Sequence, residues 1–201
     1  MQDVPRQANP RAHTPAVLFP LILLASVAAI AAKDFVMPAA HPARTYPAHD
    51  EHPMEKVTVA ADPYDVEYKA SIFSVNYRKF GFMPIFLVIT NDGDQPIALA
   101  DMKAQLNTVD HSKLPALDGE DLVRRISHPS HEIDRSQFGA KAVEPHSTAR
   151  GFLFFDVSGI SNPLAGAHFY ITGVRDPNGT ELMYFEIPLE KYLSAPESKK
   201  P

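Results

Sequence analysis

The stretch from residue 81 to residue 99 constrains the fold more than any other part of the chain. Residues 85–90 (IFLVIT) form an apolar, β-branched run. Such a run is typical of a central strand with both faces buried in a two-layer β structure. Residues 91–96 (NDGDQP) then supply Asn, Asp and Gly, the residues that favour a tight turn. A second strand is expected to begin at Ile97, so this stretch predicts an antiparallel β architecture.

Other regions carry strand or helix patterns that agree with this architecture. Residues 175–180 place Pro177 and Gly179 between two apolar runs, which is the pattern of a hairpin connection. Asp65 precedes a short helical pattern and is a suitable N-cap residue. The expected strands are 57–60, 85–90, 97–108, 149–157, 167–174 and 181–187, the expected helices are 66–72 and 118–126, and 127–144 is expected to be a long loop.

These elements predict a single folded domain at residues 56–193. We expect it to be mainly β, an immunoglobulin-like antiparallel two-sheet β-sandwich with two short helices. The chain has neither cysteine nor tryptophan, so the disulfide and buried indole of antibody domains are absent. The predicted likeness is therefore one of architecture.

The N-terminal region lacks strand patterns. Residues 16–32 are apolar and uncharged, and they follow Arg6 and Arg11, which predicts that 1–32 is a signal peptide or an N-terminal membrane anchor. Both alternatives place the rest of the chain in the periplasm or cell envelope, with membrane contact only through residues 16–32 if they are not cleaved. The Pro/His-rich residues 33–55 are expected to be a flexible tether, and 194–201 a disordered tail.

The composition excludes several partners and chemistries. Without cysteine there is no disulfide framework, thiolate metal site or cysteine nucleophile. The formal net charge is −5 and basic residues are not clustered, so nucleic acid is not an expected partner. Because no nucleophile or acid/base constellation has the required spacing, we expect a protein that is not an enzyme and has no cofactor.

Several short motifs follow one another within residues 56–193. They are Asp62-Pro-Tyr-Asp65, Gly81-Phe-Met-Pro84, Val88-Ile-Thr-Asn91, Gly151-Phe-Leu-Phe154 and Phe185-Glu-Ile-Pro188. In this order they resemble a group of uncharacterised exported bacterial proteins with a single immunoglobulin-like β-sandwich domain. That group has no known activity, so the resemblance implies fold and export and transfers no site residue.

His41, His49 and His52 are the candidate metal ligands, with Asp50 and Glu51 between the last two. Imidazole and carboxylate groups suit Zn²⁺ or Cu²⁺. The alternative is that these histidines are solvated residues of the tether.

A second candidate is an interaction patch of Tyr77, Arg78, Lys79, Phe80 and Phe82. Cationic and aromatic residues in a loop are typical of recognition surfaces. In the alternative interpretation, Phe80 and Phe82 close the end of the core while Arg78 and Lys79 face water. Seven aromatic residues on the predicted strands are expected to pack in the core, namely Phe152, Phe154, Phe155, Phe169, Tyr170, Tyr184 and Phe185.

The sequence thus favours a non-enzymatic envelope module that binds a protein or carbohydrate through its loops. The alternative function is a metal-handling protein that holds zinc or copper with the His-rich tether.

Overall fold

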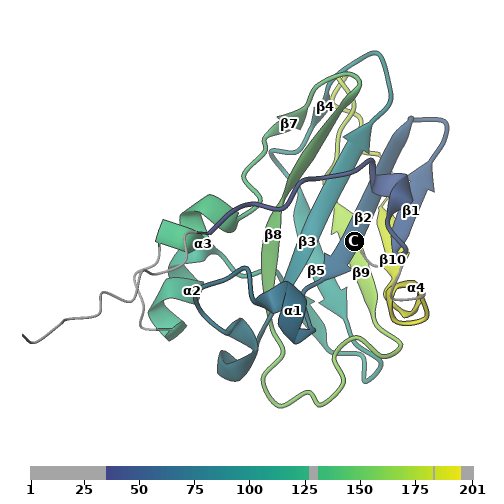
Figure 1. Ribbon diagram of the computed structural model, residues 1–201. Coiled ribbons are helices and arrows are strands. Elements are labelled where there is room, and N and C mark those ends of the chain that lie inside the picture. Colours follow the sequence, from purple (N-terminus) through teal and green to yellow (C-terminus); the bar gives the residue numbers. More distant parts are fainter. Residues whose placement is uncertain (1–34, 127–130, 183, 196–201) are drawn as a thin grey trace, which may run out of the picture. The chain divides into compact units, whose positions relative to one another are not determined.

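Two antiparallel four-stranded sheets form the centre of the fold (Figure 1). The strand order is β1-β2-β3-β8 in the first sheet and β10-β9-β5-β6 in the second, and β4 pairs with β7 in a small third sheet. The computed structural model describes residues 35–126, 131–182 and 184–195, which belong to one compact unit. The strands are β1 (His49–His52), β2 (Val57–Pro63), β3 (Phe82–Asn91), β4 (Ile97–Ala98), β5 (Lys103–Asn107), β6 (Lys113–Pro115), β7 (Ala142–Val143), β8 (Ser147–Asp156), β9 (His168–Thr172) and β10 (Phe185–Pro188). The helices are α1 (Glu67–Ala70), α2 (Gly119–Ile126), α3 (His131–Ser136) and α4 (Glu190–Leu193), with 3-10 turns η1 (Ala43–Thr45) and η2 (Tyr77–Phe80).

The first hydrophobic core lies between the two four-stranded sheets. Alternate residues of β3, including Ile85 and Leu87, share it with Phe169 and Ile171 of β9. All four side chains are fully buried. The predicted mainly β fold with antiparallel sheets and few helices is therefore confirmed.

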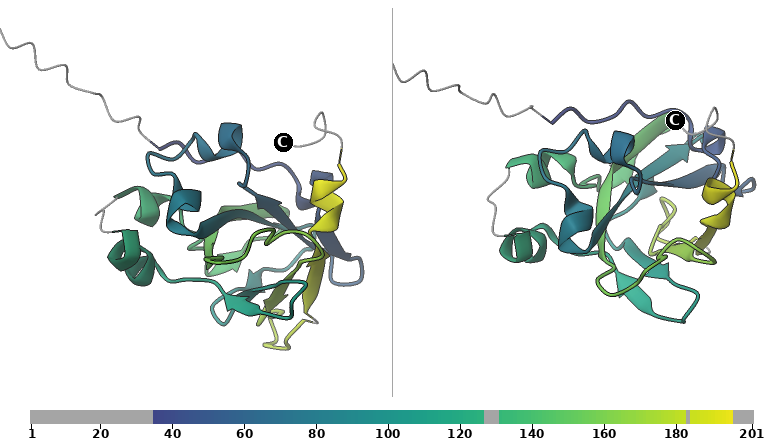
Figure 2. Two further views of the ribbon diagram at one scale, coloured as in Figure 1. Left: turned by 90° about the horizontal axis from the view of Figure 1, so that it is seen from below. Right: turned by 60° about the horizontal axis from the view of Figure 1, so that its bottom comes forward.

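A second core covers the opposite face of the first sheet. The other residues of β3 and β8, including Phe86 and Phe152, pack there against the N-terminal segment, α2, α3 and the turn η2. Figure 2 shows α1 and the N-terminal segment on one side of the first sheet and the second sheet on the other. The fold thus has three layers, and the first sheet is the middle one.

The position of β3 in the middle layer explains its sequence. Every residue of Phe82–Asn91 is buried, as the apolar run predicts. The following turn does not lead into a hairpin, however, because β4 pairs with β7 and not with β3. The predicted hairpin near the C-terminus is confirmed, since β9 and β10 pair antiparallel.

The tether predicted at 33–55 is wrong for the part that the structure describes. Phe35, Tyr46 and Ala48 are buried, and His49–His52 forms the edge strand β1. The backbone N–H of Ala43 also donates to Thr90 Oγ1 at 2.9 Å. Proline prevents a helix here, but it allows an extended segment to pack its apolar residues against a sheet.

Two local predictions also need correction. Asp65 does not cap α1, whose N-cap is Val66 without a side-chain hydrogen bond. The predicted loop 127–144 contains α3 and β7, although residues 127–130 lie outside the described part. The predicted helix at 118–126 is confirmed as α2, where Asp118 Oδ1 accepts the N–H of Asp121 at 2.7 Å.

The structure does not test the predicted membrane segment. Residues 16–32 and most of the predicted tail, 196–201, lie outside the described residues. Among the helices that are described, none has both the length and the hydropathy of a membrane span.

Candidate functional site

The candidate site is the outer face of the second sheet. Along β9, Phe169 and Ile171 point into the core, whereas His168, Tyr170 and Thr172 alternate with them and remain partly or fully exposed. Strand β5 repeats the pattern, because Ala104 and Leu106 are buried and Lys103, Gln105 and Asn107 are not. This alternation places polar and aromatic side chains together on one face.

Strand register arranges these outward residues in rows across the sheet. Tyr170 pairs with Glu186 on one side and Gln105 on the other, and Gln105 pairs with Pro115 of β6. The next row consists of Pro188, His168, Asn107 and Lys113. Side chains directly opposite each other on antiparallel strands are close enough to interact.

Glu186 joins the two rows. The hydroxyl of Tyr170 donates to Glu186 Oε1 at 2.6 Å, and His168 Nδ1 lies 2.7 Å from the same oxygen. The hydrogen bond to Glu186, with a smaller contribution from burial, raises the pKa of Tyr170 to about 12. The phenol therefore stays protonated at neutral pH and keeps its donor role.

Aromatic rings and amides surround this carboxylate. The ring centroid of Tyr170 lies 6.0 Å from that of Tyr184, which is 51% exposed, and 6.3 Å from that of His168. Beside them, the amide of Gln105 donates to Asn107 Oδ1. The face thus combines aromatic ring surfaces with hydrogen-bond donors and hydrogen-bond acceptors.

Two hollows extend over this face. One of about 490 Å³ is lined by Gln105, Asn107, Pro115 and Tyr170, among others. The second, of about 480 Å³, shares Met102, Lys103 and Thr172 with the first and continues toward Arg175.

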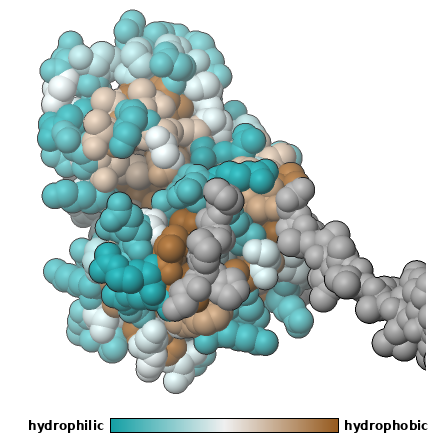
Figure 3. Space-filling view, turned by 90° about the vertical axis from the view of Figure 1, so that its left-hand side faces the viewer, coloured by the Kyte–Doolittle hydropathy of each residue, from teal (hydrophilic) through white to brown (hydrophobic). Residues whose placement is uncertain are grey.

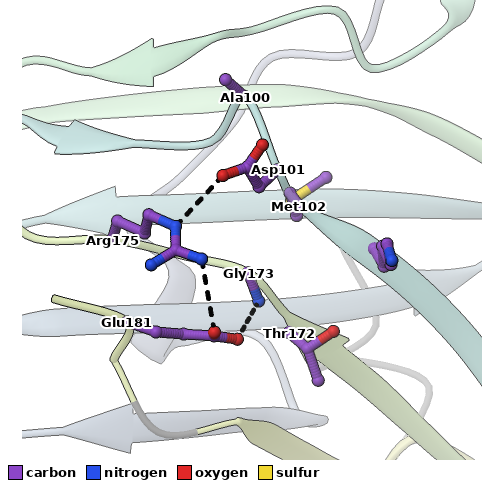
Figure 4. A pocket seen from close by; sticks show the side chains of 8 residues that line it. Ala100, Asp101, Met102, Thr172, Gly173, Arg175 and Glu181 are labelled. Carbon is purple, nitrogen blue, oxygen red and sulfur yellow. Dashed lines mark hydrogen bonds and ion pairs between the residues drawn. The ribbon is translucent and has the colours of Figure 1, made fainter. Parts of the chain in front are cut away.

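A cluster of charges forms the far wall of the second hollow. Figure 4 shows the Arg175 guanidinium between Asp101 and Glu181, with Nε 3.1 Å from Asp101 Oδ2 and Nη2 3.6 Å from Glu181 Oε2. Arg175 Nη1 also donates to the carbonyl of Gly179, and Glu181 accepts the N–H of Gly173 at 2.9 Å. These contacts hold the loop after β4 against the end of β9, so this cluster shapes the hollow.

Gly173 allows this close approach. Its φ is +74°, and a Cβ atom at this position would lie 2.2 Å from the carbonyl oxygen of Asp101. We expect Gly173→Ala to lower the free energy of unfolding by about 2–4 kcal/mol, since it adds both left-handed strain and a backbone clash. Urea denaturation measures this loss. Gly179→Ala is the matched control, because Gly179 has φ +82° and no atom near its Cβ position; equal losses in both variants would contradict the close approach.

The face that carries α2 and α3 is less suited to a site. In Figure 3 its hydrophobic side chains gather in two regions, one toward the β4–β7 end and one beside the helices, and hydrophilic side chains interrupt both. The large hydrophobic side chains exposed in the described residues belong to several different elements: Val36, Met54, Tyr68, Phe80, Val109, Tyr184 and Leu193. We therefore place the candidate site on the second sheet.

The structure does not bring the predicted metal ligands together. His49 pairs with Ala60, which belongs to the helix-side core, whereas His52 pairs with Val57 of the inner core, so the two imidazoles lie on opposite faces of β1. His52 stacks on Phe185 at 4.0 Å, and His41 is exposed before η1. The described residues contain no group of three or more His, Cys, Asp or Glu that could hold a metal ion.

The predicted interaction patch is also divided. Tyr77 and Phe82 are core residues, 2% and 3% exposed, and Tyr77 packs against Phe154. Lys79 and Phe80 remain exposed, and Arg78 is half-buried. The alternative interpretation is thus correct for Phe82, but Phe80 faces solvent.

The sequence interpretation missed the face around Tyr170. Tyr170 and Tyr184 were expected in the core, yet both lie outside it. The strict alternation of HFYIT in β9 was the available signal, because it predicts a strand with only one buried face.

Comparisons with known proteins do not indicate a function for this chain. No protein-family model matches the chain, and no curated protein matches it. One similar solved structure is a conserved hypothetical protein from Bacillus anthracis, with 16% identity and a TM-score of 0.30, covering 63% of this chain and 85% of the other.

Proposed function

We propose that the chain is a non-enzymatic binding module that recognises a carbohydrate through the outer face of the sheet β10-β9-β5-β6. The observation that carries this proposal is the row of Glu186, Tyr170 and Gln105 beside the hollow over β5. The proposed binding surface thus lies on the sheet, whereas the sequence favoured the loops.

The chemistry of the face favours a sugar over other ligands. A pyranose ring has apolar C–H faces, which stack on aromatic rings such as Tyr170 and Tyr184, and a rim of hydroxyl groups. Gln105, Asn107 and Glu186 offer the paired donors and acceptors that such hydroxyl groups require. Glu186 offsets one of the two ammonium groups on this face, Lys103 and Lys113, and the whole chain carries −5, so a neutral glycan is a better match than a polyanion.

The strand order supports an immunoglobulin-like arrangement as part of the proposal. In sheet β10-β9-β5-β6 the last two strands of the chain lie beside a pair from its middle, which is the order of strands G, F, C and C′ in such domains. Export is part of the same proposal, and it rests on the apolar residues 16–32 that follow Arg6 and Arg11.

Tyr170→Ala is expected to weaken carbohydrate binding about tenfold, because it removes a stacking surface and the donor to Glu186. Native gels containing soluble neutral polysaccharides, such as glucans and xylans, measure this as reduced retardation of the protein. Retardation of the wild type by at least one neutral polysaccharide is the expected result.

Phe80→Ala is the matched control, because Phe80 is an exposed aromatic residue of the predicted loop patch, 46% accessible. It is expected to bind like the wild type. Loss of retardation in Phe80→Ala but not in Tyr170→Ala would favour loop recognition, and a wild type that no neutral polysaccharide retards would contradict the carbohydrate proposal.

A further inference from the structure

A separate hollow of about 190 Å³ lies where η2 and the start of β3 meet the loop 158–166 and the end of α4. Its wall contains one cationic side chain, Arg78, and one anionic side chain, Asp65. The remaining wall includes the apolar side chains of Met83, Leu164 and Leu193 together with the polar ones of Ser161 and Asn162. Neither charged group belongs to the proposed carbohydrate face.

The guanidinium of Arg78 lacks a counter-ion in the part of the chain that the structure describes. Its Nη1 atom is shielded from solvent and has no hydrogen-bond acceptor there. Buried donors are nearly always paired, because an unpaired one loses its hydration without compensation. Arg78 as a whole is half-buried and lines the hollow. An acceptor from a ligand in the hollow would therefore give the guanidinium the partner that the described residues do not supply.

Asp65 is the complementary half of the hollow. Its Oδ1 accepts the hydroxyl of Tyr192 at 2.7 Å, which fixes the direction of the carboxylate. Among the described ion pairs, none joins Asp65 to a basic side chain, and none joins it to Arg78. The same hollow is thus lined by one positive and one negative side chain that do not form an ion pair with each other.

We infer that this hollow binds a small zwitterion, an α-amino acid with an aliphatic side chain. The carboxylate of the ligand pairs with the guanidinium of Arg78, whose planar donors suit a carboxylate. The ammonium group pairs with Asp65, and the aliphatic side chain lies against Met83, Leu164 and Leu193. The carboxylate of Asp65 disfavours a phosphate dianion in the same place.

Calorimetric titration of the full-length protein tests this inference, with L-valine as the probe and acetate, isobutylamine and inorganic phosphate as comparisons. L-Valine is expected to bind saturably and at least tenfold more tightly than acetate or isobutylamine, each of which supplies only one of the two charges. Phosphate is expected to bind more weakly than L-valine. No saturable heat with L-valine, or tighter binding of phosphate, would overturn the inference.

Two variants separate the two charges. Arg78→Gln is expected to lose L-valine binding, and Asp65→Asn, which keeps an oxygen for Tyr192, is expected to bind valine no more tightly than acetate. Lys79→Gln is the control, since Lys79 is exposed on the same turn. Unchanged affinity in a folded Asp65→Asn variant would overturn the inference even if Arg78→Gln did not fold.

Discussion

Replacing Lys69 by methionine is expected to lower the free energy of unfolding by about 3–5 kcal/mol. Lys69 Nζ lies 2.5 Å from Asp62 Oδ1, and both side chains are only 2% exposed. The ammonium group also lies 5.2 Å from the ring centroid of Tyr64 and 4.7 Å from that of Tyr192. The variant leaves the Asp62 carboxylate buried without this cation, so the ammonium group no longer offsets the desolvation cost of the carboxylate.

Urea denaturation measures this loss of stability. Two further variants test whether the buried ion pair is its cause. Lys56→Met removes a cation from an exposed pair, Lys56 and Asp94, and is expected to cost less than about 1 kcal/mol. Adding Asp62→Leu to Lys69→Met is expected to restore much of the lost stability, because the buried carboxylate is then removed together with its cation. The interpretation fails if Lys69→Met costs no more than Lys56→Met.

Phe152→Ala is expected to cost about 3–5 kcal/mol of folding free energy. Phe152 is fully buried on the helix side of β8. Its ring centroid lies 4.8 Å from that of Tyr64, 4.9 Å from that of Phe73 and 5.0 Å from that of Phe86. Removing the ring leaves a cavity between the first sheet and the N-terminal and helical layer that covers it.

Phe80→Ala again provides the control, because it removes the same group from a partly exposed site and is expected to cost less than about 1 kcal/mol. Thermal and urea unfolding compare the two variants. A Phe152→Ala variant as stable as Phe80→Ala would mean that this third layer is not packed on the sheet.

Much of the fold follows from local patterns in the sequence. The apolar run of β3, the hairpin of β9 and β10 and the amphipathic helix α2 were predicted because each depends on nearby residues. The third layer was not predicted. Phe35 and Tyr46 lie among prolines, in a composition typical of a flexible tether. They are buried only because the outer face of the first sheet lies against them.

The candidate site escaped prediction for a related reason. The sheet of β3 and β8 is covered on both faces, whereas the sheet of β9 is covered on one, and aromatic residues occur in both sheets. Phe152 is therefore a core residue and Tyr170 a surface residue, although each lies in an aromatic strand. The segments that cover the second face of the first sheet are distant from its strands in sequence. The local composition of a strand therefore does not show whether one or both of its faces are buried.

Amide chemical-shift mapping tests the carbohydrate-binding face most directly. The isotope-labelled protein is titrated with an oligosaccharide from the polysaccharide that retards it most. The shifted resonances are expected to concentrate in β5, β9 and β10, around Gln105, Tyr170 and Glu186. Shifts confined to residues 77–82 or to the helical layer, with β9 unchanged, would contradict this expectation.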